Sequence, residues 1–181
     1  AKFHQEKSRL EALSNLTERY DGYGGSVKAV MERKEQEKGI IGVVADIIQA
    51  EAKYETAIET ALGGNIQNIV TEDEETAKRM IGYLKKNRSG RATFLPLTSI
   101  THPQEFKNPE ALKEKGVIGM ADELVKIDKK YQNVAKAMLG RIVVVDHVDN
   151  AVKIARKFDY GIRMVTLEGE LLVPGGAISG G

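Results

Sequence analysis

The chain has 181 residues, of which 41% are hydrophobic and 29% charged, a composition typical of a globular protein with room for one or two small cores. Its formal net charge of +1 gives the chain as a whole no strong attraction for nucleic acid or membrane. The absence of cysteine excludes disulfides and thiolate chemistry, and no apolar run approaches the roughly 18 residues that span a bilayer. The three histidines, His4, His102 and His147, lack metal-ligand spacing, so we expect no metal site. Without cysteine, a spanning segment or a visible signal peptide, we expect a cytosolic location.

Residues 1–20 are charged and contain neither glycine nor proline, which is typical of a helix. Phe3 and Leu10 share one heptad position, and Leu13 falls at another, but polar residues interrupt the seam. Two interpretations stay open: the end of a longer coiled coil, or an ordinary N-terminal helix.

The glycine-rich segment 21–28 breaks this helix and begins another that we expect to run to about residue 38. It superficially suggests a phosphate loop, but the Walker spacing fails and no strand precedes it. We therefore predict a turn that redirects the chain.

From residue 39 onward the sequence repeats itself. The pattern Gly-Ile-Ile-Gly at 39–42 returns as Gly-Val-Ile-Gly at 116–119, an offset of 77 residues. Leu62 and Leu139 match at the same offset. The repeat predicts two lobes of one architecture, at about 39–97 and 116–174.

Each lobe has the same predicted order of elements: a short apolar segment, an alanine-rich helix that stops at glycine, a strand, a second helix and a final strand. We expect the alanine-rich helices at 50–62 and 128–139, the middle strands at 65–70 and 141–145, and the final strands at 92–97 and 163–167. In the first lobe, Thr71 and Glu74 predict a capping box for the second helix, and Lys85 and Lys86 close it. This order indicates a mixed α/β (α+β) fold.

Prolines cluster around 96–109, which indicates a connection between the lobes at 98–115. The second lobe adds a predicted hairpin at 167–170, which leads into a tail, 173–181, with four glycines. Glycine weakens an extended segment, so these four glycines need another explanation. One explanation is the close approach of a second backbone, which a Cβ would obstruct. No charge protects this tail from pairing, and we interpret it as a surface that pairs with another chain.

Three groups of residues carry a resemblance to a known family: Tyr20-Asp21-Gly22-Tyr23, the string Gly-Arg-Ala-Thr-Phe-Leu-Pro-Leu at 90–97, and Gly-Gly-Ala-Ile-Ser-Gly-Gly at 175–181. Together they resemble the hinge domain of a bacterial structural-maintenance-of-chromosomes (SMC) protein. The resemblance extends from about residue 15 to the last glycine.

The resemblance implies the SMC hinge fold, with a coiled-coil end at 1–20, a first hinge subdomain at 21–100, an interlobe connection at 101–115 and a second subdomain at 116–181. It also implies homodimerisation that closes an SMC ring, in a chromosome-condensation and segregation ATPase of the nucleoid. The ATPase heads and accessory subunits belong to the full-length protein, so we expect no enzyme activity and no cofactor in this chain.

For the dimer interface, the resemblance assigns the paired glycines of the tail. The predicted set is Gly175, Gly176, Ile178, Gly180 and Gly181, and the repeat adds the strand at Thr93, Phe94 and Leu95 as the surface that completes the contact.

Four cations without an intervening acid, Lys85, Lys86, Arg88 and Arg91, follow the second helix of the first lobe. One interpretation is structural, because cations stabilise a helix C-terminus. The other is a patch that contacts DNA phosphates weakly and without sequence specificity, since no base-reading module is apparent. Both interpretations stay open.

An alternative function is a small α/β domain that binds a nucleotide or another ligand with its glycine loops. It lacks the lysine and the acidic partner that such a site needs.

Overall fold

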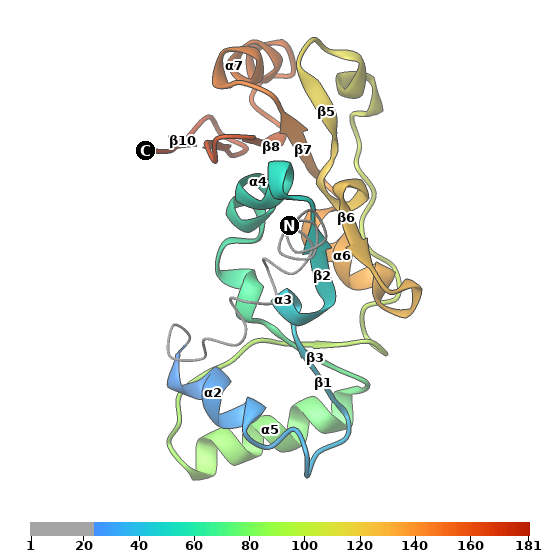
Figure 1. Ribbon diagram of the computed structural model, residues 1–181, viewed down its shortest axis with the longest axis vertical. Coiled ribbons are helices and arrows are strands. Elements are labelled where there is room, and N and C mark those ends of the chain that lie inside the picture. The colour runs from blue at the N-terminus through green and yellow to red at the C-terminus, as the bar shows by residue number, and fades with distance from the viewer. Residues whose placement is uncertain (1–23) are drawn as a thin grey trace, which may run out of the picture.

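The structure is a computed structural model that describes residues 24–181, so the predicted coiled-coil end at 1–20 lies outside the described residues. The described chain is elongated and holds a three-stranded sheet in one half and a five-stranded sheet in the other, with a two-stranded ribbon between them (Figure 1). Helices and strands are mixed throughout, which confirms the predicted fold class.

The internal repeat is confirmed by the topology of the two larger sheets. In the first repeat the strands are β1 (Ile40–Val43), β3 (Ile69–Thr71) and β4 (Phe94–Pro96), and in the second they are β5 (Val117–Met120), β7 (Ile142–Val145) and β8 (Arg163–Thr166). The first strand of each set pairs antiparallel with the second, which pairs parallel with the third. Even the register irregularities recur, between Ile40 and Gly42 in one repeat and between Val117 and Gly119 in the other.

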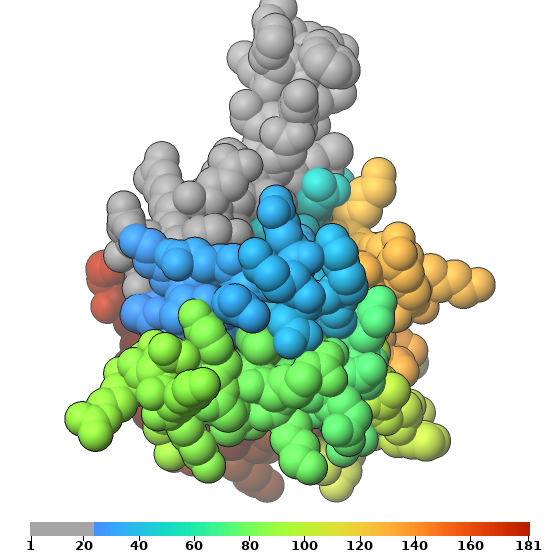
Figure 2. Space-filling view, turned by 90° about the horizontal axis from the view of Figure 1, so that it is seen from below, coloured from blue at the N-terminus to red at the C-terminus, as the bar shows by residue number. Residues whose placement is uncertain are grey.

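The helices recur in the same way. The alanine-rich helices are α4 (Ala52–Leu62) and α6 (Gln132–Leu139), the latter preceded by the 3₁₀ turn η5 (Lys129–Tyr131), and the second helices are α5 (Glu74–Lys86) and α7 (Val148–Lys157). In the first repeat, α2 (Gly25–Met31) packs against α5, and Figure 2 shows these two segments forming the end of the molecule. The connection between the repeats carries one 3₁₀ turn, η3 (Pro109–Lys113).

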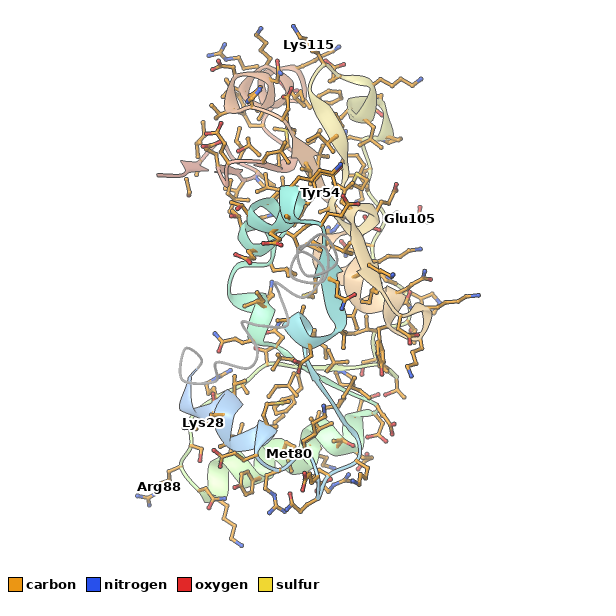
Figure 3. All side chains as sticks on the ribbon, in the orientation of Figure 1. Lys28, Tyr54, Met80, Arg88, Glu105 and Lys115 are labelled. Atoms are coloured by element: carbon orange, nitrogen blue, oxygen red, sulfur yellow. The ribbon has the colours of Figure 1, made fainter. Side chains whose placement is uncertain are left out.

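A ribbon that the sequence did not predict joins the two repeats. After the helical turn α3 (Val44–Ile47), β2 (Ile48–Ala50) pairs antiparallel with β6 (Val125–Ile127), which follows the 3₁₀ turn η4 (Ala121–Leu124). One hydrophobic core lies around this ribbon and is shared by both repeats, with Ile48 and Ile58 from the first and Leu139 and Val144 from the second. Tyr54 packs against the same core from α4 (Figure 3). Burial of this apolar surface holds the two repeats together.

Two of the predicted element bounds were wrong. The helix predicted to reach residue 38 ends at Met31, because the residues after it are mostly charged and exposed and form turns. The strand predicted at 65–70 begins with a 3₁₀ turn, η2 (Gly63–Gln67), so that only Ile69–Thr71 pair.

The predicted capping box of α5 was also wrong. The N-cap is Asp73, whose Oδ1 accepts hydrogen bonds from the Thr76 hydroxyl at 2.7 Å and from its backbone N–H at 2.8 Å. Thr71 is a residue of β3, and its hydroxyl donates to the carbonyl of Asp73. The hydrogen bonds from the side chain and backbone of Thr76 lower the pKa of Asp73, since they stabilise its ionised form.

Within residues 24–181, no helix is both long and apolar enough to cross a membrane.

Candidate functional site

The tail ends in an edge strand. β10 (Ile178–Ser179) pairs antiparallel with β9 (Leu171–Leu172), and the five-stranded sheet runs in the order β10-β9-β8-β7-β5. The Val173 N–H donates to the carbonyl of Ala177 at 3.1 Å, and antiparallel ladders alternate, so the backbone N–H and C=O of Ile178 point away from β9. Among residues 24–181, the sheet therefore ends in one unpaired donor and one unpaired acceptor at Ile178.

The side chain at this edge is equally open. Ile178 is 54% exposed, the largest value among the exposed large hydrophobic residues of the described chain. Residues 174–181 are exposed throughout. An exposed, uncharged edge of this kind is a surface on which another strand can add.

The strand that the repeat assigned to the other side of the contact is also an edge. In the part of the chain that the structure describes, β4 pairs with β3 alone, and the three-stranded sheet runs in the order β1-β3-β4. The Ile69 N–H donates to the Thr93 carbonyl, and the Leu97 N–H donates to the Thr71 carbonyl, both at 2.9 Å. The backbone N–H and C=O groups of Thr93, Leu95 and Leu97 therefore point towards β3. Those of Phe94, between them, point away from the sheet.

The side chains of the predicted β4 set differ in their surroundings. Thr93 is exposed, whereas Phe94 is half-buried against the core beneath α5. Leu95 is buried, with 8% of its surface exposed, and belongs to the core that the repeats share. Pro96 has no N–H, and its carbonyl accepts from Ser99 and Ile100, so among the described residues Phe94 carries the free donor of this edge.

The two edges lie in different halves of one molecule. β10 lies in the half that holds α7, and β3 with its neighbour β4 lies in the half that holds α5 (Figure 1). The edges therefore do not pair with each other within one chain.

The tail glycines have local reasons to be glycine. Gly175, Gly176 and Gly181 adopt φ values of +100°, +103° and +111°, a region that side chains with a Cβ rarely occupy. A Cβ on Gly180 would stand 3.0 Å from Cγ of Glu170. The first two glycines form the turn between β9 and β10, and the Gly176 N–H donates to the Val173 carbonyl at 3.0 Å.

The basic cluster lies where α5 ends, at the end of the molecule away from the tail. Lys85, Lys86, Arg88 and Arg91 are all exposed, and within residues 24–181 none of them forms an ion pair. Arg88 adopts φ +50° and projects outward from this end (Figure 3). In the second repeat, by contrast, Lys157 at the equivalent helix end pairs with Glu114 at 2.8 Å.

Tyr160 is a residue beside the tail that sequence reasoning missed. It is 45% exposed, its carbonyl accepts from the Gly175 N–H at 2.9 Å, and a Cβ on Gly176 would stand 3.8 Å from Cδ1 of its ring. Its position depends on the left-handed backbone at Tyr160, and an aspartate followed by a tyrosine carries no signal for that conformation.

Comparison with known proteins places this chain in a family. Residues 37–155 match the family model of the SMC proteins' flexible hinge domain, and the chain belongs to that family. It is 40% identical over 179 residues to the chromosome partition protein Smc of Bacillus subtilis (strain 168), and 39% identical to the protein of that name from Lactiplantibacillus plantarum. Each alignment covers 98% of this chain but only 15% of the relative, so the chain spans about a seventh of the proteins it matches.

Solved structures of SMC hinge domains have the same fold as this chain. The SMC hinge domain of Geobacillus stearothermophilus, crystallised as an asymmetric dimer, superposes with a TM-score of 0.83 and 37% identity, covering 98% of this chain and 74% of that one. The hinge domain of the Pyrococcus furiosus SMC protein gives a TM-score of 0.73 with 35% identity, over 94% of this chain and 87% of that one. These findings confirm the resemblance and favour the hinge over the ligand-binding alternative.

Proposed function

We propose that this chain is the homodimerisation hinge of an SMC chromosome-partition protein, and that β10 of one copy pairs with β4 of the other. The observation that carries the proposal is the pair of open sheet edges in opposite halves of the molecule, at Ile178 and at Phe94. The crystallised dimer of the Geobacillus stearothermophilus hinge domain supports it.

Pairing of β10 with β4 produces a closed, two-fold symmetric dimer. If β10 of the first copy pairs with β4 of the second, a two-fold axis repeats the contact with the roles exchanged. Both edges of both copies are then covered, which removes the exposed strands. The second contact becomes intramolecular once the first has formed, so dissociation should be slow.

In the longer protein that the relatives represent, two hinges joined in this way would close a ring whose far ends are ATPase heads with accessory subunits. The ring would act in chromosome condensation and segregation at the nucleoid. In this scheme the hinge supplies the joint, and catalysis belongs to the heads.

Sedimentation equilibrium of the chain tests dimerisation, set against the monomer mass of 19.9 kDa. We expect a dimer at micromolar concentration and a monomer for Ile178→Asp, because a charge on an edge strand opposes pairing. Leu112→Asp, at an exposed leucine of η3, serves as the control and should leave the dimer intact. A wild-type chain that sediments as a monomer would overturn the proposal.

Weak, non-specific DNA binding is a second proposed activity. Its support is the contrast between the two repeats: the four cations after α5 are exposed and without carboxylate partners among the described residues, whereas Lys157 is paired. Unpaired cations are free to displace counterions from phosphates, and this displacement drives non-specific binding.

A further inference from the structure

The turn that follows α7 contains two consecutive residues other than glycine in the left-handed region. Asp159 has φ +53° and Tyr160 has φ +58°. This conformation is uncommon for any residue with a Cβ and is a clear outlier for a bulky aromatic one. Such outliers persist only where the surrounding structure holds them in place.

The equivalent turn in the first repeat lacks the second outlier. There the Ser89 N–H donates to the Leu84 carbonyl at 3.0 Å, as the Tyr160 N–H donates to the Ala155 carbonyl at 2.7 Å. Arg88 adopts the left-handed conformation, but Ser89 does not. The additional left-handed residue thus occurs only in the repeat that carries the glycine tail.

The additional left-handed residue, Tyr160, contacts the β9–β10 hairpin. The Tyr160 carbonyl accepts the Gly175 N–H, and a Cβ on Gly176 would stand 3.8 Å from Cδ1 of the Tyr160 ring. Gly175 is therefore held by a hydrogen bond to Tyr160, and the Tyr160 ring lies beside Gly176. Within residues 24–181, the Tyr160 hydroxyl makes no hydrogen bond, so the contact depends on the ring and the carbonyl.

We propose that Tyr160 is a positioning residue: through Gly175 and Gly176 it fixes the β9–β10 hairpin, and so sets the angle at which β10 meets a second copy of this chain. The inference rests on the proposed dimerisation. A two-residue strand at a sheet edge is short, and fixing its turn beforehand reduces the ordering that pairing would otherwise require.

Tyr160→Gly separates the ring from the backbone. Glycine adopts φ +58° without strain, so this variant keeps the turn and its carbonyl while it loses the aromatic contact. We expect the dimer dissociation constant to rise about tenfold and the Gly175 and Gly176 amides to exchange hydrogen faster. Tyr160→Phe should retain the wild-type dissociation constant, because it keeps the ring.

Thermal melting in an Ile178→Asp background isolates the effect on the monomer. There Tyr160→Gly relieves backbone strain but gives the unfolded chain the greater freedom of glycine, so we expect its melting temperature to stay close to that of its parent. A residue that only supports the core would lower the melting temperature markedly when replaced by glycine. Ser89→Gly, at the equivalent position of the first repeat, is the matched control and should leave the dissociation constant unchanged.

Wild-type affinity and wild-type exchange in Tyr160→Gly would overturn the inference while leaving the proposed dimerisation standing. A melting temperature of Tyr160→Gly well below that of its parent in the monomeric background would overturn it as well. A monomeric wild-type chain would overturn both proposals together.

Discussion

Gly39 lies directly against Thr76 at the start of α5. A Cβ on Gly39 would stand 2.9 Å from the Thr76 Cβ and closer still to its hydroxyl, which is held by Asp73. The second repeat has the same arrangement, because a Cβ on Gly116 would stand 2.6 Å from Nδ2 of Asn150 on α7. The glycine that begins each repeat thus makes room for the first turn of the second helix.

Gly39→Ala should lower the free energy of unfolding by about 1–3 kcal/mol, the usual cost of overpacking, because Thr76 is buried and has no room to move. Urea denaturation measures it. Gly82→Ala is the control: it lies within α5 with open space around it, and should raise the free energy of unfolding by about 0.5–1 kcal/mol. Equal effects of the two variants would contradict the packing argument.

Substituting alanine for all four tail glycines, Gly175, Gly176, Gly180 and Gly181, should yield a folded monomer. Each alanine forced to positive φ costs roughly 1–2 kcal/mol, and each 1.4 kcal/mol is a factor of ten in affinity. The tail is exposed, so circular dichroism should show an unchanged fold while sedimentation shows the loss of the dimer. Gly64→Ala, at an exposed glycine with open space around it, should leave the dimer unaffected. A four-alanine variant that remains a dimer would be strong contrary evidence.

Changing Lys85, Lys86, Arg88 and Arg91 to glutamate should abolish DNA binding. For the wild type, three or four phosphate contacts predict a slope of about −3 to −4 when the logarithm of the binding constant is plotted against that of the salt concentration. Fluorescence anisotropy with a labelled duplex measures the slope. Lys157→Glu should change it little, because that cation is already paired with Glu114. Binding that persists in the four-glutamate variant would exclude the basic cluster as the site.

Glu59 on α4 should make the fold less stable as pH rises. Burial raises its pKa above the ordinary 4.5, and the neighbouring Glu55 raises it further. In the unfolded chain Glu59 ionises at the ordinary value, so the folded state loses stability as pH increases from about 4.5 to the raised pKa. Glu59→Gln should therefore raise the melting temperature at pH 7 and have little effect at pH values below the unfolded pKa. A benefit that is the same at both pH values would contradict this account.

The sequence repeat was enough to predict the order of the elements in each half, because strands, helices and glycines recur in the same order in both. The ribbon of β2 and β6 was missed, since two three-residue strands beside helical turns leave no periodic pattern and their pairing joins distant segments. The N-cap of α5 was misassigned because Thr71 and Asp73 are both capping residue types, and only the pairing of β3 excludes the former.

The candidate interface was predictable in part. Uncharged, glycine-rich sequence marked the tail, and the repeat pointed to β4. The direction of the outward backbone groups at Ile178 and Phe94, and the position of Tyr160 beside the tail, depend on strand register and on left-handed backbone that no residue pattern signals.

Mixing two defective variants tests most directly whether β10 of one copy pairs with β4 of the other. Ile178→Asp spoils β10 and Thr93→Asp spoils β4, at two exposed side chains, so each variant alone has two damaged contacts. A mixed dimer has one intact contact, formed by the unaltered β10 of one variant and the unaltered β4 of the other. We predict that the mixture sediments as a dimer at concentrations where each variant alone is a monomer. If the mixture stays monomeric there, the pairing of β10 with β4 is contradicted.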